Sequence, residues 1–191
     1  MEEKFITACL TGKLLIAKIL YYINLIINSN INYNYAFRWS CENGHLHVAQ
    51  WLLEVKPAIN ISAENKQAFR WACANGNLKV AKWLLQVKPT INISAKNEEA
   101  FVWACLFGKL HIAQWLLQVK PTIDISAENE FAFRYACLRG HLKVAQWIQS
   151  LMPIKYVIKP TGDPYIIPHK VFNTLIILTV IKTKGYEPRL T

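Results

Sequence analysis

The sequence predicts an all-α solenoid in which short helix-turn-helix units stack along one axis and are joined by short extended connectors. Three observations support this fold class. Cysteines recur every 32 residues, at positions 9, 41, 73, 105 and 137. A glycine follows each cysteine three positions later, and a tryptophan recurs in the same register at 51, 83, 115 and 147. A fixed period of this length is typical of repeat architectures, in which each unit contacts only its neighbours.

The first helix of each unit is expected to follow an asparagine. Asn65, Asn97 and Asn129 are predicted N-caps, because a side-chain amide oxygen can accept a bond from the free N–H groups of a helix start. In the fourth unit this places a helix from Glu98 to Phe107, which Gly108 then ends.

The second helix of that unit is expected from Leu110 to about Val119. Its apolar residues cover a wide arc, which suits a helix buried between two neighbours. Pro121 prevents its continuation, and the alternating β-branched residues 122–126 predict an extended connector. Neither helix can bury its apolar face alone, so the units are expected to stack.

This period divides the chain into a repeat domain over residues 1–153 and a tail. The predicted repeats are near 4–35 (degenerate), 36–67, 68–99, 100–131 and 132–153 (partial). Residues 154–191 carry no repeat signature, and their 171–181 segment could be a strand or a buried helix. Because the last face of a solenoid must be shielded, this non-repeat C-terminal tail is expected to act as a cap.

The repeated phrases resemble those of ankyrin-repeat proteins. Asn43-Gly44-His45-Leu46-His47-Val48-Ala49 is similar to the ankyrin N-G-H-L-x-V-V/A segment, and Ile-Asn-Ile at 59–61 resembles the V-N-A of the finger loop. The sequence departs from the family in two ways. The T-P-L-H tetrapeptide is replaced, as by Glu99-Ala100-Phe101-Val102, and the period is 32 rather than 33.

The A-F-R-W-A-C phrase further resembles the ankyrin families of giant DNA viruses of amoebae (mimivirus-like). The ankyrin resemblance implies a non-enzymatic protein–protein interaction module or scaffold that binds through its concave face and finger loops. It implies an intracellular protein, in the cytoplasm of the host cell if the chain is viral. The expected partner is another protein, belonging to the host in that case, and the chain is expected to be a monomer.

Comparison of the repeats with one another separates shared from variable positions. Trp39, Trp71 and Trp103, and the column of Trp51, are filled alike and are predicted to form core ladders. Variable positions are free of the shared stack, and in the last repeats several become apolar. The candidate partner-binding residues are Val102, Leu106, Phe107, Phe131 and Leu138, with Arg70, Arg134 and Arg139 from the same variable positions. Alternatively, these apolar residues seal the last repeats against the tail.

The residue pattern gives no reason to expect catalytic, metal or cofactor chemistry. The cysteines have the spacing of the repeat rather than that of zinc ligands or disulfides, which suits small buried side chains in a reducing compartment. Lysines occupy the columns that hold His45 and His47 in other repeats, which is typical of a solvated helix start. No nucleophile elbow or phosphate-binding loop occurs, so we expect no enzyme, no metal and no cofactor.

Two other functions remain open. Ile167-Pro168-His169-Lys170-Val171 resembles the start of an F-box, so the tail could make the chain a substrate adaptor of a ubiquitin ligase. The net charge of +10, from 22 basic and 12 acidic residues, would suit nucleic acid or an acidic partner. Basic and acidic residues are interspersed, however: residues 36–151 contain thirteen basic and eight acidic residues. Nucleic acid is therefore not the expected partner, and no apolar stretch is long enough for a membrane span.

Overall fold

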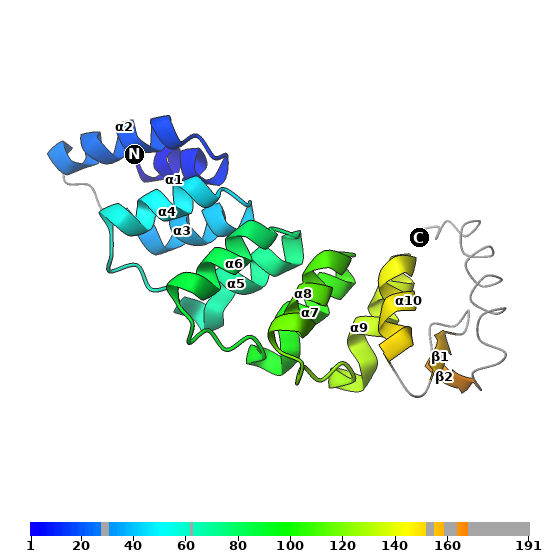
Figure 1. The fold of residues 1–191 in the computed structure, drawn as a ribbon. Coiled ribbons are helices and arrows are strands. Elements are labelled where there is room, and N and C mark those ends of the chain that lie inside the picture. The colour runs from blue at the N-terminus through cyan, green and yellow to red at the C-terminus, as the bar shows by residue number, and fades with distance from the viewer. Residues whose placement is uncertain (28–30, 62, 152–154, 159–163, 168–191) are drawn as a thin grey trace, which may run out of the picture.

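The computed structural model describes residues 1–27, 31–61, 63–151, 155–158 and 164–167. In these residues the chain forms consecutive helix pairs, followed by a short hairpin (Figure 1). The pairs are α1 (Glu2–Leu10) with α2 (Leu14–Ile27), α3 (Tyr33–Glu42) with α4 (Leu46–Val55), α5 (Ala63–Asn75) with α6 (Leu78–Val87), α7 (Ala95–Leu106) with α8 (Leu110–Val119), and α9 (Ala127–Leu138) with α10 (Leu142–Leu151).

The pairs stack in chain order, so that each contacts the pair before it and the pair after it (Figure 1). The first helices α1, α3, α5, α7 and α9 pack directly on one another in sequence, more closely than the second helices do. This difference curves the stack and places the first helices on its inner side. The predicted all-helical solenoid is confirmed for the repeat region.

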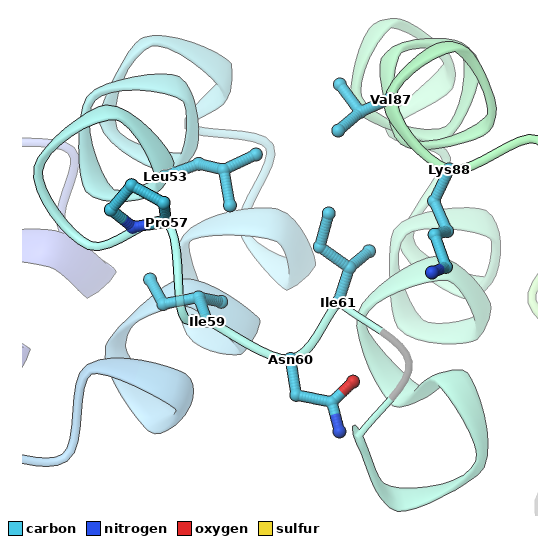
Figure 2. Close-up of a pocket in the computed structure, with 7 residues that line it drawn as sticks. All are labelled: Leu53, Pro57, Ile59, Asn60, Ile61, Val87 and Lys88. Atoms are coloured by element: carbon cyan, nitrogen blue, oxygen red, sulfur yellow. The ribbon is translucent and has the colours of Figure 1, made fainter.

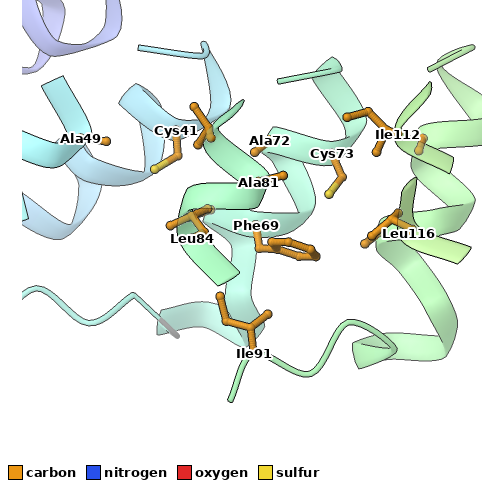
Figure 3. Packing of buried hydrophobic residues seen from close by; sticks show 14 of the residues in the cluster. Cys41, Ala49, Phe69, Ala72, Cys73, Ala81, Leu84, Ile91, Ile112 and Leu116 are labelled. Carbon is orange, nitrogen blue, oxygen red and sulfur yellow. The ribbon is translucent and has the colours of Figure 1, made fainter. Parts of the chain in front are cut away.

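A column of phenylalanines forms the centre of the core. In each repeat the first helix contributes one ring that is at most 1% exposed: Phe5, Phe37, Phe69, Phe101 and Phe133. Figure 3 shows Phe69 between Leu84 of its own repeat and Leu116 of the next, with Ile91 of the connector close by. Burying a large aromatic between two repeats couples their stabilities, which explains why every repeat keeps this residue.

The prediction that both tryptophan columns are core ladders is only partly right. Trp51 is 7% exposed, while Trp83, Trp115 and Trp147 are half-buried and pack on the phenylalanine of the preceding repeat, as Trp83 does on Phe37 with ring centroids 6.2 Å apart. Trp39, Trp71 and Trp103 are also only half-buried. They lie two positions after the core phenylalanine, about 200° around the helix, although Trp103 still packs against the core.

The turn between the two helices of a repeat needs glycine for two reasons. Gly44 has a φ of +79°, which side chains other than glycine rarely adopt. A Cβ at this position would also lie 2.5 Å from Oδ1 of Asn77, a residue of the next repeat. The close approach lets the Asn77 amide donate to the Glu42 carbonyl at 2.6 Å.

His45 makes the equivalent bond one repeat earlier, with Nε2 2.9 Å from the Leu10 carbonyl oxygen. His47 and His111 likewise lie 3.3 Å from the Gly12 carbonyl and 3.2 Å from the Gly76 carbonyl. These contacts satisfy carbonyls at the end of the first helix or in the following turn, which have no partner within the helix. The histidine columns therefore tie neighbouring repeats together and are more than a solvated helix start.

The predicted asparagine N-caps are wrong, because α5, α7 and α9 each begin two residues before the asparagine. Ser94 and Ser126 occupy the N-cap positions of α7 and α9 without a side-chain cap bond. The chain is instead turned into the helix by the residue two positions earlier. The Asn92 side chain accepts from the Ser94 N–H at 3.1 Å, and Asp124 accepts from Ser126 at 2.9 Å.

The connectors are turns anchored by one buried isoleucine each, Ile59, Ile91 and Ile123, which are at most 7% exposed. The Lys120 ammonium donates to the Ser94 hydroxyl, which joins two successive connectors. This bond links neighbouring loops in a chain that lacks the usual ankyrin tetrapeptide.

Beyond α10 the structure describes one hairpin that the sequence did not predict. Strand β1 (Lys155–Ile158) pairs antiparallel with β2 (Pro164–Ile167), with Lys155 opposite Ile167. The segment 171–181 and most of the F-box-like phrase lie outside the described residues. The role of the tail as a cap or as an adaptor therefore stays a prediction.

Candidate functional site

The candidate residues lie mainly on the inner helices α7 and α9. On α9, Phe131, Arg134 and Leu138 are spaced by three and four residues, so they share one face of the helix. Leu106 ends α7 and Phe107 follows it, as Leu138 ends α9 and Arg139 follows it. Because α7 and α9 pack side by side, these two helix ends lie at the same edge of the stack.

Two of the candidate residues are inside the stack instead. Arg70 is 3% exposed, and its guanidinium forms an ion pair with Glu99 of the next repeat. It also lies over the Trp103 ring, with Cζ 5.7 Å from the centroid. Burial lowers the pKa of Arg70. Val102 is 5% exposed, so both side chains hold neighbouring helices together and present little surface.

The residue in the column of Arg38, Arg70 and Val102 varies together with a residue on the first helix of the next repeat. In α3 the Arg38 guanidinium donates to the Gln67 side chain of α5 at 2.9 Å. One repeat later Arg70 pairs with Glu99. The next members of these two columns are Val102 and Phe131, one buried and the other packed against the core. A polar pair is thus replaced by an apolar pair as a unit.

Arg134 is the last member of the arginine column in the repeats. Its Nε is buried and has no hydrogen-bond partner among the described residues. Beside it on α9, the Phe131 and Tyr135 rings stack, with centroids 3.9 Å apart and planes at 20°. A buried donor without a partner is costly, so this position is suited to an acceptor supplied from outside the repeats.

Phe107 and Leu138 are exposed apolar side chains at the helix ends, with 41% and 54% of their surface accessible. In earlier repeats the position of Phe107 holds Asn43 and Asn75. Those amides donate to the carbonyls of Trp39 and Glu42, each at 2.9 Å. Phe107 cannot make this bond. We call Leu106, Phe107, Phe131, Arg134, Leu138 and Arg139 the C-terminal patch.

Sequence reasoning missed a row of partly buried aromatic rings that contact one another on the first helices. Trp71 and Trp103 of adjacent repeats contact one another, with ring centroids 4.7 Å apart. In the flanking repeats Trp39 packs on Tyr35 and Tyr135 on Phe131. The signal was present in the sequence, since a residue two positions after a buried helical residue lies about 200° around the helix from it.

A separate hollow of about 340 Å³ lies between the connector after α4 and the end of α6. Figure 2 shows Leu53, Ile59, Ile61 and Val87 around this space, with Asn60 and Lys88 at its margin. The lining is mostly aliphatic and has no acid–base pair or metal-ligand set. It is the space left where one connector passes from its own repeat to the next.

The cysteines are free thiols with no sign of reactivity. Burial raises the pKa of Cys9 and Cys137 to about 12, and it raises the pKa of Cys41, Cys73 and Cys105 further. A thiol that stays protonated is a poor nucleophile and metal ligand. Among the described residues, no three His, Cys, Asp or Glu side chains gather where they could hold a metal ion. No helix in that part of the chain is long and apolar enough to cross a bilayer.

The helix pairs, their glycine turns and their stacking define a helical repeat protein. Residues 5–97 match the family of ankyrin repeats, in three copies. This stretch is therefore similar to ankyrin repeats, as the residue phrases indicated, and the stacked helix pairs form a solenoid of that fold class.

Comparison with solved structures agrees with this assignment, and 130 chains match. One is an ankyrin repeat family protein from Legionella pneumophila, which is 33% identical over 70% of this chain with a TM-score of 0.59. The chain spans 40% of the length of that protein. No curated protein matches. This relative is bacterial, and the resemblance to viral families stays a prediction.

Proposed function

We propose that the chain is a non-enzymatic interaction module that binds another protein through the C-terminal patch. The observation that carries the proposal is the exposure of Phe107 and Leu138 at two neighbouring helix ends. Ankyrin repeats are generally protein–protein interaction modules, which supports a protein as the partner. If the chain is viral, a protein of the host cell is the proposed partner.

The patch has the physical features of a contact site rather than of a stabilising element. Phe107 forgoes the backbone bond that Asn43 and Asn75 make and exposes an aromatic ring instead, which gives the isolated stack no benefit. Clustered apolar residues rimmed by arginines are typical of interface centres. We infer a partner segment with a large apolar side chain and a carboxylate, the group that a guanidinium binds best.

The test replaces the patch with residues that other repeats carry in the same columns. Phe107→Asn copies Asn75, and Leu138→Glu copies Glu42. We expect the double variant to keep the thermal midpoint of the parent but to lose partner capture from host-cell lysate by tenfold or more. Val87→Thr, at an exposed position of a second helix, is the matched control and should capture normally. Undiminished capture by the double variant would disprove the assignment.

The salt dependence of binding separates a protein partner from nucleic acid. Arg38 is bonded to Gln67 and Arg70 is paired with Glu99, so these two guanidinium groups are engaged within the stack. We therefore expect only a shallow dependence of partner affinity on salt. A steep loss of affinity between low and moderate salt, together with retention of nucleic acid, would favour the alternative.

A further inference from the structure

The second helix of the first repeat, α2, exposes an apolar face that nothing in the described part of the chain covers. At about 100° per residue its exposed side chains fill a continuous arc of roughly 180°, while Ala17, Tyr21 and Asn24 lie buried on the opposite side. The exposed residues are Leu15 (72%), Ile16 (45%), Ile19 (50%), Tyr22 (62%), Ile23 (38%), Leu25 (55%) and Ile26 (83%). We call these seven residues the α2 face.

The repeat register shows what part of this face is built for. Ile16 is in the column of Val48, which is 0% exposed because it packs inside the stack. Ile19 is in the column of Trp51, which packs on Phe5 of the preceding repeat at 6.4 Å. In the later repeats these columns receive the helix pair that comes before. In α2 the same columns are apolar, and their side chains are exposed among the described residues.

Other α2 positions are apolar where the later repeats are polar. Leu15 is in the column of His47 and Lys79, and Tyr22 is in the column of Glu54 and Gln86. These residues extend the apolar surface from the stacking columns to the outer side of α2, and an exposed apolar face of this size favours association.

We propose that the α2 face docks a second copy of this chain, so that two stacks join at their first repeats. The exposed fractions of the seven side chains amount to about four whole side chains, or roughly 700 Å² per copy at about 180 Å² each. Two copies would bury up to about 1,400 Å², within the range of stable protein interfaces. The same face on both copies is what a two-fold dimer requires.

The charges near the α2 face favour a protein surface over a lipid surface. Lys13 and Lys18 lie at its margin, and the adjoining helix α1 carries Glu2, Glu3 and Lys4, a net charge of +1 for the group. An interfacial helix needs a basic rim that attracts anionic lipids. The local charges here nearly cancel, so apolar contact with a matching helix is the better fit. The proposed dimer differs from the monomer expected from the sequence, and the oligomeric state decides between them.

Sedimentation velocity of the full chain over the micromolar range tests the proposal. We expect a species of twice the 22.0 kDa monomer mass. Leu15→Lys, Tyr22→Gln and Ile26→Thr import residues from the same columns of later repeats, so the triple variant should fold and sediment as a monomer. Val87→Lys with Val119→Lys, at exposed sites on α6 and α8, is the matched control and should remain a dimer.

Three results would overturn the proposal. The parent could sediment as a monomer throughout this range, or the triple variant could remain a dimer while folded. Alternatively, a monomeric parent could bind vesicles of phosphatidylserine and phosphatidylcholine through the α2 face. The C-terminal patch is at the other end of the stack, so partner capture by the triple variant is unaffected in every case.

Discussion

In the middle of the stack, a residue that differs from its column is paired with a matching residue of the next repeat. At the two ends of the described stack, such residues have no partner of this kind. In the middle, Arg38 meets Gln67 and Arg70 meets Glu99. At the ends, the α2 face and the exposed Phe107 and Leu138 have no described counterpart.

This difference teaches how to interpret variation in a repeat protein. A variable position is not free of the stack when the neighbouring repeat varies with it, as Arg70 and Val102 show by being buried. The informative positions are those that vary alone and stay exposed. By that criterion, the two ends of this chain are its candidate contact surfaces, and the middle is scaffold.

The largest expected effect tests which aromatic column holds the middle together. Phe69→Ala removes a ring that is 1% exposed between two repeats and should lower the free energy of unfolding by about 3–5 kcal/mol. Trp71→Ala removes a half-buried ring and should cost less than half as much. Urea denaturation followed by circular dichroism measures both. A larger loss for Trp71→Ala would restore the tryptophans as the principal core ladder.

The next effect tests whether neighbouring columns act as matched pairs. Arg70→Val alone leaves the Glu99 carboxylate without its ion-pair partner and should cost about 2–4 kcal/mol. Adding Glu99→Phe recreates the residue types of Val102 and Phe131, and stability should return to within about 1 kcal/mol of the parent. Chemical denaturation of both single variants and the double variant gives the coupling energy. Simple additivity of the two losses would show that the columns vary independently.

The smallest effect compares a turn in the middle with one at the end. Gly108 and Gly140 have φ values of +71° and +72°, so alanine at either costs about 1–2 kcal/mol through the backbone alone. A Cβ at Gly108 would also lie 2.6 Å from Nδ1 of His141, whereas no described atom lies within 4 Å of one at Gly140. Gly108→Ala should therefore lower the thermal midpoint more. Equal shifts would mean that the inter-repeat contact adds nothing.

The sequence predicted the solenoid and the helix-turn-helix unit, because a period of 32 residues repeats each structural position five times. It also placed the turn glycines and four buried cysteines, whereas Cys137 is only partly buried. Its errors were local. The first helices start before Asn97 and Asn129 because side chains at Asn92 and Asp124 turn the backbone earlier. The asparagine column at 65, 97 and 129 is equally periodic, so the repeat period alone did not decide which polar residue precedes the helix.

The candidate site was predicted less completely than the fold. The exposed positions of Phe107, Leu138 and Arg139 could be inferred from their place at helix ends. The burial of Arg70 could not, because it depends on Glu99 and Trp103, which belong to the next repeat. Likewise, the α2 sequence is apolar enough for a core helix, and only its position at the end of the stack leaves half of it exposed.

The sequence by itself thus determined the repeat class, the number of helix pairs and the residues that every pair shares. Those properties are encoded within single repeats, where spacing along the chain sets which side chains lie on one face of a helix. The tertiary structure decided which variable residues are paired across repeats, which rings are only half-buried and which faces have no neighbour. Those properties depend on residues of neighbouring repeats meeting in space, as Arg38 and Gln67 do, and a pattern within one repeat does not contain that information.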